Sequence, residues 1–158
     1  MTALDLTVAS SVERSEMVAD WGFRLRPAEG GTFWRTVMTE WSGFDAIDHE
    51  SFFHLFYCYR RAWTPGLMHP DDRAAYAALP GRMTVYRGAD LSAPMGLSWT
   101  LDRDIAAGFA EGHRGMMNPC PAVFTATVSP ADVAFMQTER GEREVVLFAF
   151  VEHPEVEW

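Results

Sequence analysis

The chain has 158 residues, of which 48% are hydrophobic and 22% charged, so we expect one globular domain over residues 1–158 with a single core. Its formal net charge of −9 argues against permanent electrostatic binding of nucleic acid, because such binding depends on clustered Lys and Arg. We therefore expect no stable nucleic-acid binding, although the charge leaves room for a nucleic acid as a transient substrate.

The N-terminal residues 1–17 lack the basic start and the long apolar run of a signal peptide. Nowhere do about 18 apolar residues follow one another, as a membrane span requires. Cys58 and Cys120 are the only cysteines and form neither a CxxC motif nor a framework of pairs, which indicates a reduced compartment. We expect a cytoplasmic protein with no membrane association, and export without a cleaved signal stays open as an alternative.

The first half of the chain, residues 1–80, has the pattern of helices. Apolar residues recur at helical spacing over residues 48–63, where Asp48 is placed to cap the helix and the sequence TPG ends it. Residues 31–44 and 70–79 predict two more helices, the second with Pro70 in its first turn. His49 and His54 lie ~140° apart around a helix, so they cannot share a metal ion, and no metal site is predicted.

The second half, residues 81–158, has the pattern of strands. Short segments rich in β-branched and aromatic residues end at Gly, Pro or Asp, and they predict strands over residues 83–88, 96–100, 122–128 and 144–151. One helix, capped by Asp102, is predicted over residues 102–112. Residues 111–121 and 129–141 read as loops, with a short strand over Val133 to Met136 as an option. The fold class is therefore α+β.

Two carboxylates stand where the last predicted strand begins, in the sequence ERGEREVVLF. Strand alternation places Glu142 and Glu144 on one face. Taken alone this is a weak signal, because charges at the end of a strand are usually just solvated.

Other polar residues occupy similar places in two earlier strands. Arg87 ends the strand MTVYRG, and Ser98 and Thr100 share one face of GLSWT while Trp99 takes the other. Each has a structural explanation of its own: a surface arginine paired with Asp90, and a polar strand edge. Their order along the chain carries more information than any one of them.

An aromatic residue before Arg-Gly, then Ser-x-Thr leading into a helix, then Glu-x-Glu opening an apolar strand resembles the Arg/Ser/Glu class of mono-ADP-ribosyltransferases, the cholera-toxin-like branch. The resemblance covers residues 83–151 and is strongest in VYRG, GLSWTLDRDIAAGFA and ERGEREVV. It implies an N-terminal helical segment packed on two small, mostly antiparallel sheets that form a cleft for NAD. Arg87, Ser98 and Glu144 should then meet in that cleft.

The resemblance implies that NAD is the substrate and that no metal takes part. Arg87 would bind the NAD phosphates through forked, charge-assisted hydrogen bonds. Tyr86, which precedes it, would line the NAD site, and the backbone of Gly88 would meet the nicotinamide amide. Phe109 would stack on the nicotinamide ring, with packing against Ile105 as its structural alternative.

The remaining motif residues would carry the chemistry. Ser98 would bind the ribose and orient Glu144, with Thr100 supporting the strand. Glu144 would stabilise the positive charge that develops on the ribose as its bond to nicotinamide breaks. Glu142 would draw a proton from the acceptor group, and a glutamate at that place in the family goes with arginine acceptors. The loop FMQTERG, with Phe135, Met136 and Gln137, would touch the target.

The leading hypothesis is thus a transferase that attaches ADP-ribose to a protein arginine, as a toxin or effector of bacterial or phage origin. Its partners would be a protein substrate and an antitoxin or immunity protein. Alternatives are transfer to nucleic acid or to a small molecule, hydrolysis of NAD, a binding protein that keeps the fold without the chemistry, or an ordinary α+β domain in which the pattern is a coincidence.

Overall fold

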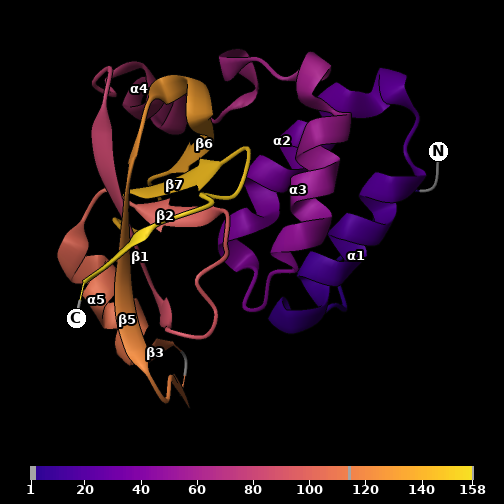
Figure 1. Ribbon diagram of the computed structural model, residues 1–158. Helices are drawn as coiled ribbons and strands as arrows, with labels where there is room; N and C mark the ends of the chain where they lie inside the picture. Colours follow the sequence, from indigo (N-terminus) through magenta and orange to yellow (C-terminus); the bar gives the residue numbers. More distant parts are fainter. Residues whose placement is uncertain (1–2, 114, 158) are drawn as a thin grey trace. The chain divides into compact units, whose positions relative to one another are not determined.

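The structure is a computed structural model that describes residues 3–113 and 115–157 (Figure 1). The chain divides into two compact units, Met1–His69 and Pro70–Trp158, which we call the helical unit and the sheet unit. The dividing point comes before the helix predicted over residues 70–79, so this helix belongs to the sheet unit.

The helical unit is built from α1 (Ser11–Arg24), α2 (Gly30–Glu40) and α3 (His49–Cys58), with short 3-10 turns at Pro27–Glu29, Trp41–Gly43, Arg60–Ala62 and Pro65–Leu67. The helices predicted from residues 31–44 and 48–63 are confirmed as α2 and α3, and Asp48 caps α3 by accepting from the backbone N–H of Ser51. Helix α1 was not predicted, although Ser10 and Glu13 form a capping box that marks its start in the sequence.

Aromatic side chains fill the interior of the helical unit. The fully buried ones are Phe33, Trp34, Trp41, Phe52 and Phe56, and their rings meet at mostly tilted or edge-on angles. The indole N–H of Trp34 is satisfied too, because it donates to the main-chain oxygen of Tyr59 at 2.8 Å.

The sheet unit contains α4 (Pro70–Ala77) and α5 (Arg103–Glu111). Its strands are β1 (Met83–Asp90), β2 (Ser98–Thr100), β3 (Gly112–His113), β4 (Met116–Met117), β5 (Pro121–Val128), β6 (Val133–Gln137), β7 (Glu144–Leu147) and β8 (Glu155–Glu157). Six of them form one antiparallel sheet in the order β6-β7-β2-β1-β5-β8. The α+β class is confirmed, but instead of two small sheets the unit has this sheet and the short β3-β4 ladder.

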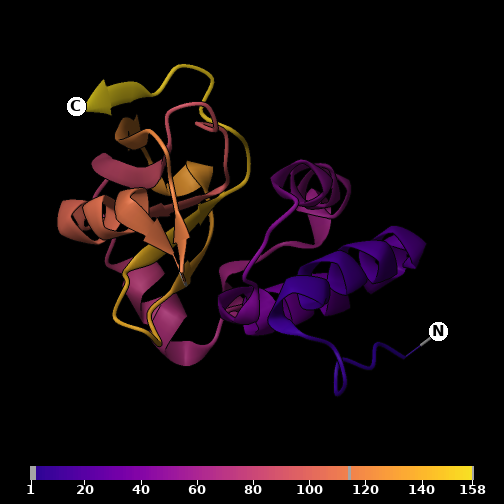
Figure 2. The same ribbon diagram turned by 90° about the horizontal axis from the view of Figure 1, so that it is seen from below.

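The ends of the sheet depart from the prediction. Strand β7 stops at Leu147, earlier than expected, and β8 was not predicted. Strand β8 pairs with β5 at the edge of the sheet, seen in yellow in Figure 2. Its glutamates obscure it in the sequence, because a charged edge strand lacks the apolar alternation of a covered one. The optional strand near residue 133 is confirmed as β6.

The two faces of the sheet are covered differently. Apolar side chains gather on one face, and they include Met83, Val85, Trp99, Phe124, Val145 and Leu147. On the other face α5 lies against β1 and β5 (Figure 1), capped as predicted by Asp102, which accepts from the N–H groups of Asp104 and Ile105. The candidate site is lined by α5 and by Tyr86 and Gly88 of this second face, together with Arg87 and Trp99.

Candidate functional site

A small cavity in the sheet unit brings together the residues predicted to bind NAD or to carry the chemistry. Its volume is about 110 Å³, and it is lined by Tyr86, Arg87, Gly88, Ser98, Trp99, Thr100, Ala106, Phe109, Glu142 and Glu144. The described pairing between β1 and β2 is the single pair Tyr86 with Thr100, whereas β1 pairs with β5 from Met83 to Asp90. The cavity therefore lies where β1 and β2 part.

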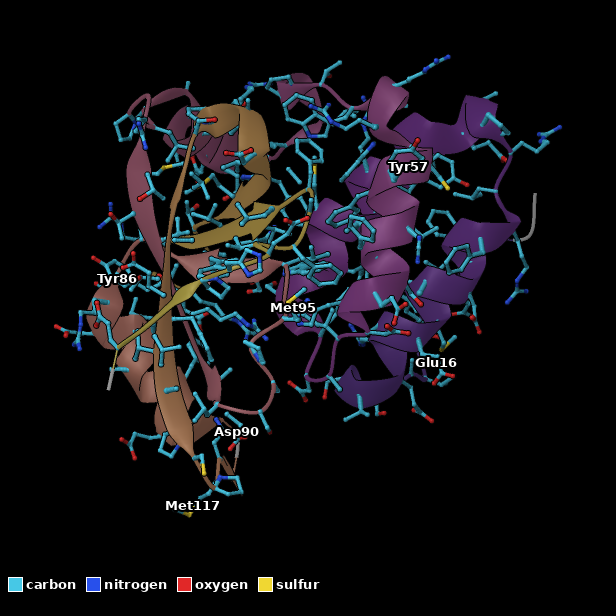
Figure 3. The ribbon with its side chains drawn as sticks, viewed as in Figure 1. Glu16, Tyr57, Tyr86, Asp90, Met95 and Met117 are labelled. Atoms are coloured by element: carbon cyan, nitrogen blue, oxygen red, sulfur yellow. The ribbon has the colours of Figure 1, made fainter. Side chains whose placement is uncertain are left out.

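Gly88 is the reason that α5 can lie so close to β1. A Cβ atom at this position would come within 1.8 Å of the main-chain oxygen of Ala106. Tyr86 packs beside the same helix, against the cluster of Ala106, Ala110 and Val123 (Figure 3). The structure thus gives Gly88 a packing requirement that the sequence did not suggest, and the predicted contact of its backbone with nicotinamide stays a prediction.

Ser98 and Glu144 are joined by a side-chain hydrogen bond, in which the Ser98 hydroxyl donates to the Glu144 carboxylate. They come from neighbouring strands, because β2 pairs with β7 through Ser98 with Val146 and Thr100 with Glu144. Both side chains are half-buried. The orientation of Glu144 by Ser98, expected from the sequence, corresponds to this contact.

Arg87 places its guanidinium against the main chain of Gly96 and Ser98, at the start of β2. Its Nη1 donates to the main-chain oxygen of Ser98 at 3.0 Å, while its Nε is buried and has no hydrogen-bond partner among the described residues. Burial lowers the pKa of Arg87 to about 10, and the negative charge of Glu144 acts in the opposite direction. Arg87 therefore stays cationic at neutral pH beside the Ser98–Glu144 pair.

Gly96 is a site residue that the sequence prediction missed. A Cβ atom there would lie 2.2 Å from Cζ of Arg87 and 2.5 Å from both of its Nη atoms. The guanidinium can lie against the main chain only because this position has no side chain. The indole N–H of Trp99 also donates to the Gly96 main-chain oxygen at 3.1 Å. This bond holds the main chain just before β2 in place.

Thr100 connects three parts of the site. Its hydroxyl donates to the main-chain oxygen of Glu142 at 2.7 Å and accepts from the backbone N–H of Asp102 at 3.1 Å. It therefore links β2, the start of α5 and the segment that precedes β7. This buried threonine holds the main chain that carries Glu142.

Glu142 and Glu144 both line the cavity, but they do not share one face of a strand as predicted. Strand β7 begins at Glu144, so Glu142 lies outside it and strand alternation does not apply. Arg143, between them, has a φ of 46°, the one positive φ among the described non-glycine residues. The left-handed conformation of a residue with a side chain is uncommon and costs energy, and such residues cluster at functional sites.

The prediction that Phe135, Met136 and Gln137 touch a target is wrong. They belong to β6, and their exposed fractions are 0%, 2% and 7%. Helix α4 contacts β6, and Met136 belongs to the apolar cluster of the sheet. The exposed part of the segment is the following turn, which includes Glu139 and Arg140.

Over residues 3–113 and 115–157 no cluster of three or more His, Cys, Asp or Glu could hold a metal ion. Over the same residues, the helices are too short or too polar to cross a membrane.

Comparisons with models of known protein families, with curated proteins and with solved structures give no match for this chain.

Proposed function

We propose that the protein is a mono-ADP-ribosyltransferase, which transfers ADP-ribose from NAD to a protein, with arginine as the acceptor. One observation carries the proposal: a chain of contacts from the Arg87 guanidinium to the main chain of Ser98, and from the Ser98 hydroxyl to the Glu144 carboxylate. The three residues come from β1, β2 and the start of β7, and they line one cavity.

Glu144 is placed to act on the sugar of NAD. When the bond between ribose and nicotinamide breaks, its electron pair leaves with nicotinamide and positive charge develops on the ribose. A carboxylate that is held in place stabilises this charge most strongly in a site that excludes water. The bond from Ser98 and the pairing of β7 with β2 hold Glu144 in place.

The cavity suits one end of NAD rather than the whole molecule. At about 110 Å³ it is smaller than the 300–1,000 Å³ that is typical of pockets for larger ligands. We infer that the nicotinamide end enters it beside Phe109, while the remainder of NAD lies outside. The buried Nε–H of Arg87 lacks a partner among the described residues, so an unsatisfied donor belongs to a residue that lines the cavity.

Glu142 supports arginine as the acceptor. It lines the same cavity, and its main chain is fixed by Thr100, so its carboxylate can take a proton from an attacking guanidine group. The formal charge of −9 favours encounter with a basic protein.

The test is to incubate the purified protein with NAD and measure released nicotinamide, with labelled NAD and an arginine-rich peptide to measure transfer. We expect Glu144→Gln to lower nicotinamide release by a factor on the order of 100 to 1,000. Glu142→Gln should keep the release in water and abolish labelling of the peptide. Glu152→Gln, which changes an exposed carboxylate outside the cavity and outside this segment, is the control and should match the parent.

The proposal is wrong if the parent releases no nicotinamide, or if Glu144→Gln releases it as fast as the parent does. Release without labelling of any acceptor would instead identify an NAD hydrolase.

A further inference from the structure

The segment that carries Glu142 is tied to α4 by one acidic residue. Oδ1 of Asp72 accepts from the backbone N–H of Thr138 at 2.9 Å and from the Thr138 hydroxyl at 2.7 Å. Asp72 lies in the first turn of α4 and is separated from Thr138 by 66 residues. We propose that Asp72 is a positioning residue for Glu142, an inference that rests on the proposed function.

Thr138 begins the connection between β6 and β7. It follows the last residue of β6, and its main-chain oxygen accepts from the N–H of Gly141 at 3.0 Å, which closes a turn. Gly141 has a φ of 69°, and Glu142 comes directly after it. Asp72 therefore fixes the first residue of the turn whose exit is Glu142.

The exit of this turn is held as well. The hydroxyl of Thr100 donates to the Glu142 main-chain oxygen, and the N–H of Leu101 donates to the Arg143 main-chain oxygen at 3.2 Å. With anchors at both ends, the connection has a defined path rather than a free one. Loss of the anchor at Thr138 releases one end and widens the range of positions open to the Glu142 side chain.

Glu144 depends much less on Asp72. It pairs with Thr100 of β2 and with Gln137 of β6, and its carboxylate accepts from Ser98. These contacts remain when the Asp72 carboxylate is removed. The inference therefore separates two reactions: transfer to an acceptor, which needs Glu142, should depend on Asp72, and cleavage of NAD with water should not.

A neighbouring residue separates this role from a general effect on α4. Asp71 and Asp72 are both acidic residues of the first turn, where negative charge interacts favourably with the helix dipole. Asp71 is exposed, whereas Asp72 is half-buried against Thr138. Asp71→Ala removes the same charge from the same turn and leaves the contact with Thr138 in place.

The experiment measures nicotinamide release in water and labelling of an arginine-rich peptide for each variant. Because a misplacement of about 1 Å can cost roughly 100-fold, we expect Asp72→Ala to lower labelling by about 10-fold to 100-fold, with release within about twofold of the parent. Asp72→Asn keeps an oxygen that can accept both bonds, so it should recover most of the labelling. Asp71→Ala should match the parent in both reactions.

Thr138→Val keeps the backbone N–H and loses only the hydroxyl, so its labelling should fall less than that of Asp72→Ala. In the double variant Asp72→Ala/Thr138→Val, the loss of Asp72 has already removed the partner of the Thr138 hydroxyl. Labelling by the double variant should therefore equal that by Asp72→Ala alone. Amide exchange over residues 138–143 should be faster in Asp72→Ala than in Asp71→Ala.

An equal fall of both reactions in Asp72→Ala and Asp72→Asn would assign Asp72 a purely structural role and overturn the inference, as would unchanged labelling in Asp72→Ala. If the parent neither releases nicotinamide nor labels the peptide, the proposed function itself is wrong and the role of Asp72 falls with it. If the parent both releases nicotinamide and labels the peptide, the proposed function stands, and a negative result for the Asp72 variants counts against the role of Asp72 alone.

Discussion

The helical unit and the sheet unit use their interiors differently. The largest buried side chains of the helical unit are aromatic and aliphatic, and Ser15 is the buried polar residue there among those described. In the sheet unit, the cationic Arg87 and the Ser98–Glu144 pair lie partly or largely out of water beside the buried Thr100. One interior is almost wholly apolar, and the other keeps a connected polar group in its middle.

This difference distinguishes buried side chains that stabilise the fold from buried side chains that are candidates for chemistry. Apolar burial stabilises a fold, whereas the removal of a charge from water costs free energy that a paired geometry only partly offsets. The lowered pKa of Arg87 is the sign of that cost, since burial disfavours its charged form. Groups with perturbed pKa values that meet in a cavity mark a candidate functional site, and the sheet unit contains such a group.

The largest effect is expected from a substitution that destabilises the helical unit alone. Trp34→Ala removes a fully buried indole and should lower the free energy of unfolding by about 3–5 kcal/mol. Nicotinamide release per folded molecule should stay at the level of the parent. Urea unfolding with activity assays under native conditions checks both expectations.

The matched control is Tyr57→Ala on α3, where the side chain is 81% exposed (Figure 3). Its unfolding free energy should change by less than about 0.5 kcal/mol. A large loss of release per folded molecule in Trp34→Ala would show that the helical unit contributes to the chemistry, against the division made above.

A second change tests the polar interior of the sheet unit. Gly96→Ala places a methyl group where the Arg87 guanidinium lies, so it should cost about 1–3 kcal/mol in the free energy of unfolding and reduce nicotinamide release as well. Gly108→Ala in α5 is the control, because a methyl group there would meet no atom within 4 Å beyond its own helix backbone and chain neighbours. There the better helix propensity of Ala should stabilise the protein by up to about 1 kcal/mol.

Retention of full activity by Gly96→Ala would mean that the position of Arg87 against the main chain is unimportant. A loss of activity in Gly108→Ala would point to the exposed side of α5 instead.

The smallest expected effect concerns the cap of α3. Asp48→Ala should lower the free energy of unfolding by about 1 kcal/mol at neutral pH, because Asp48 accepts hydrogen bonds from the side chain and backbone of Ser51. These bonds lower the pKa of Asp48 below its ordinary value of 3.8, the side-chain bond more than the backbone bond. Its contribution is thus complete above that value and is lost as the pH falls through the folded-state pKa.

Urea unfolding of parent and variant at a series of pH values measures this difference. Glu50→Ala, in the first turn of the same helix, serves as the control and should show a smaller difference at neutral pH. A difference between parent and Asp48→Ala that persists unchanged well below pH 3.8 would contradict the capping role.

Elements with local signals could be predicted from the sequence. The spacing of apolar residues and the caps at Asp48 and Asp102 identified α3 and α5, and β-branched runs identified β1, β2 and β5. The motifs also singled out residues that the structure brings to one cavity. Such signals are readable because helix periodicity, capping and strand composition act over a few neighbouring residues.

The contacts that build the cavity could not be predicted from the sequence and became visible only in the folded structure. The left-handed conformation of Arg143 is a matter of main-chain geometry, which composition does not encode. The space that Gly96 leaves for Arg87 and the bonds from Thr138 to Asp72 are contacts between residues apart in the sequence. The burial of β6 likewise follows from its surroundings, because α4 contacts it and Val133 and Met136 belong to the apolar cluster of the sheet. Long-range contacts of this kind leave no periodic trace in the sequence, because each partner alone is compatible with many environments, and only the fold selects the one in which they meet.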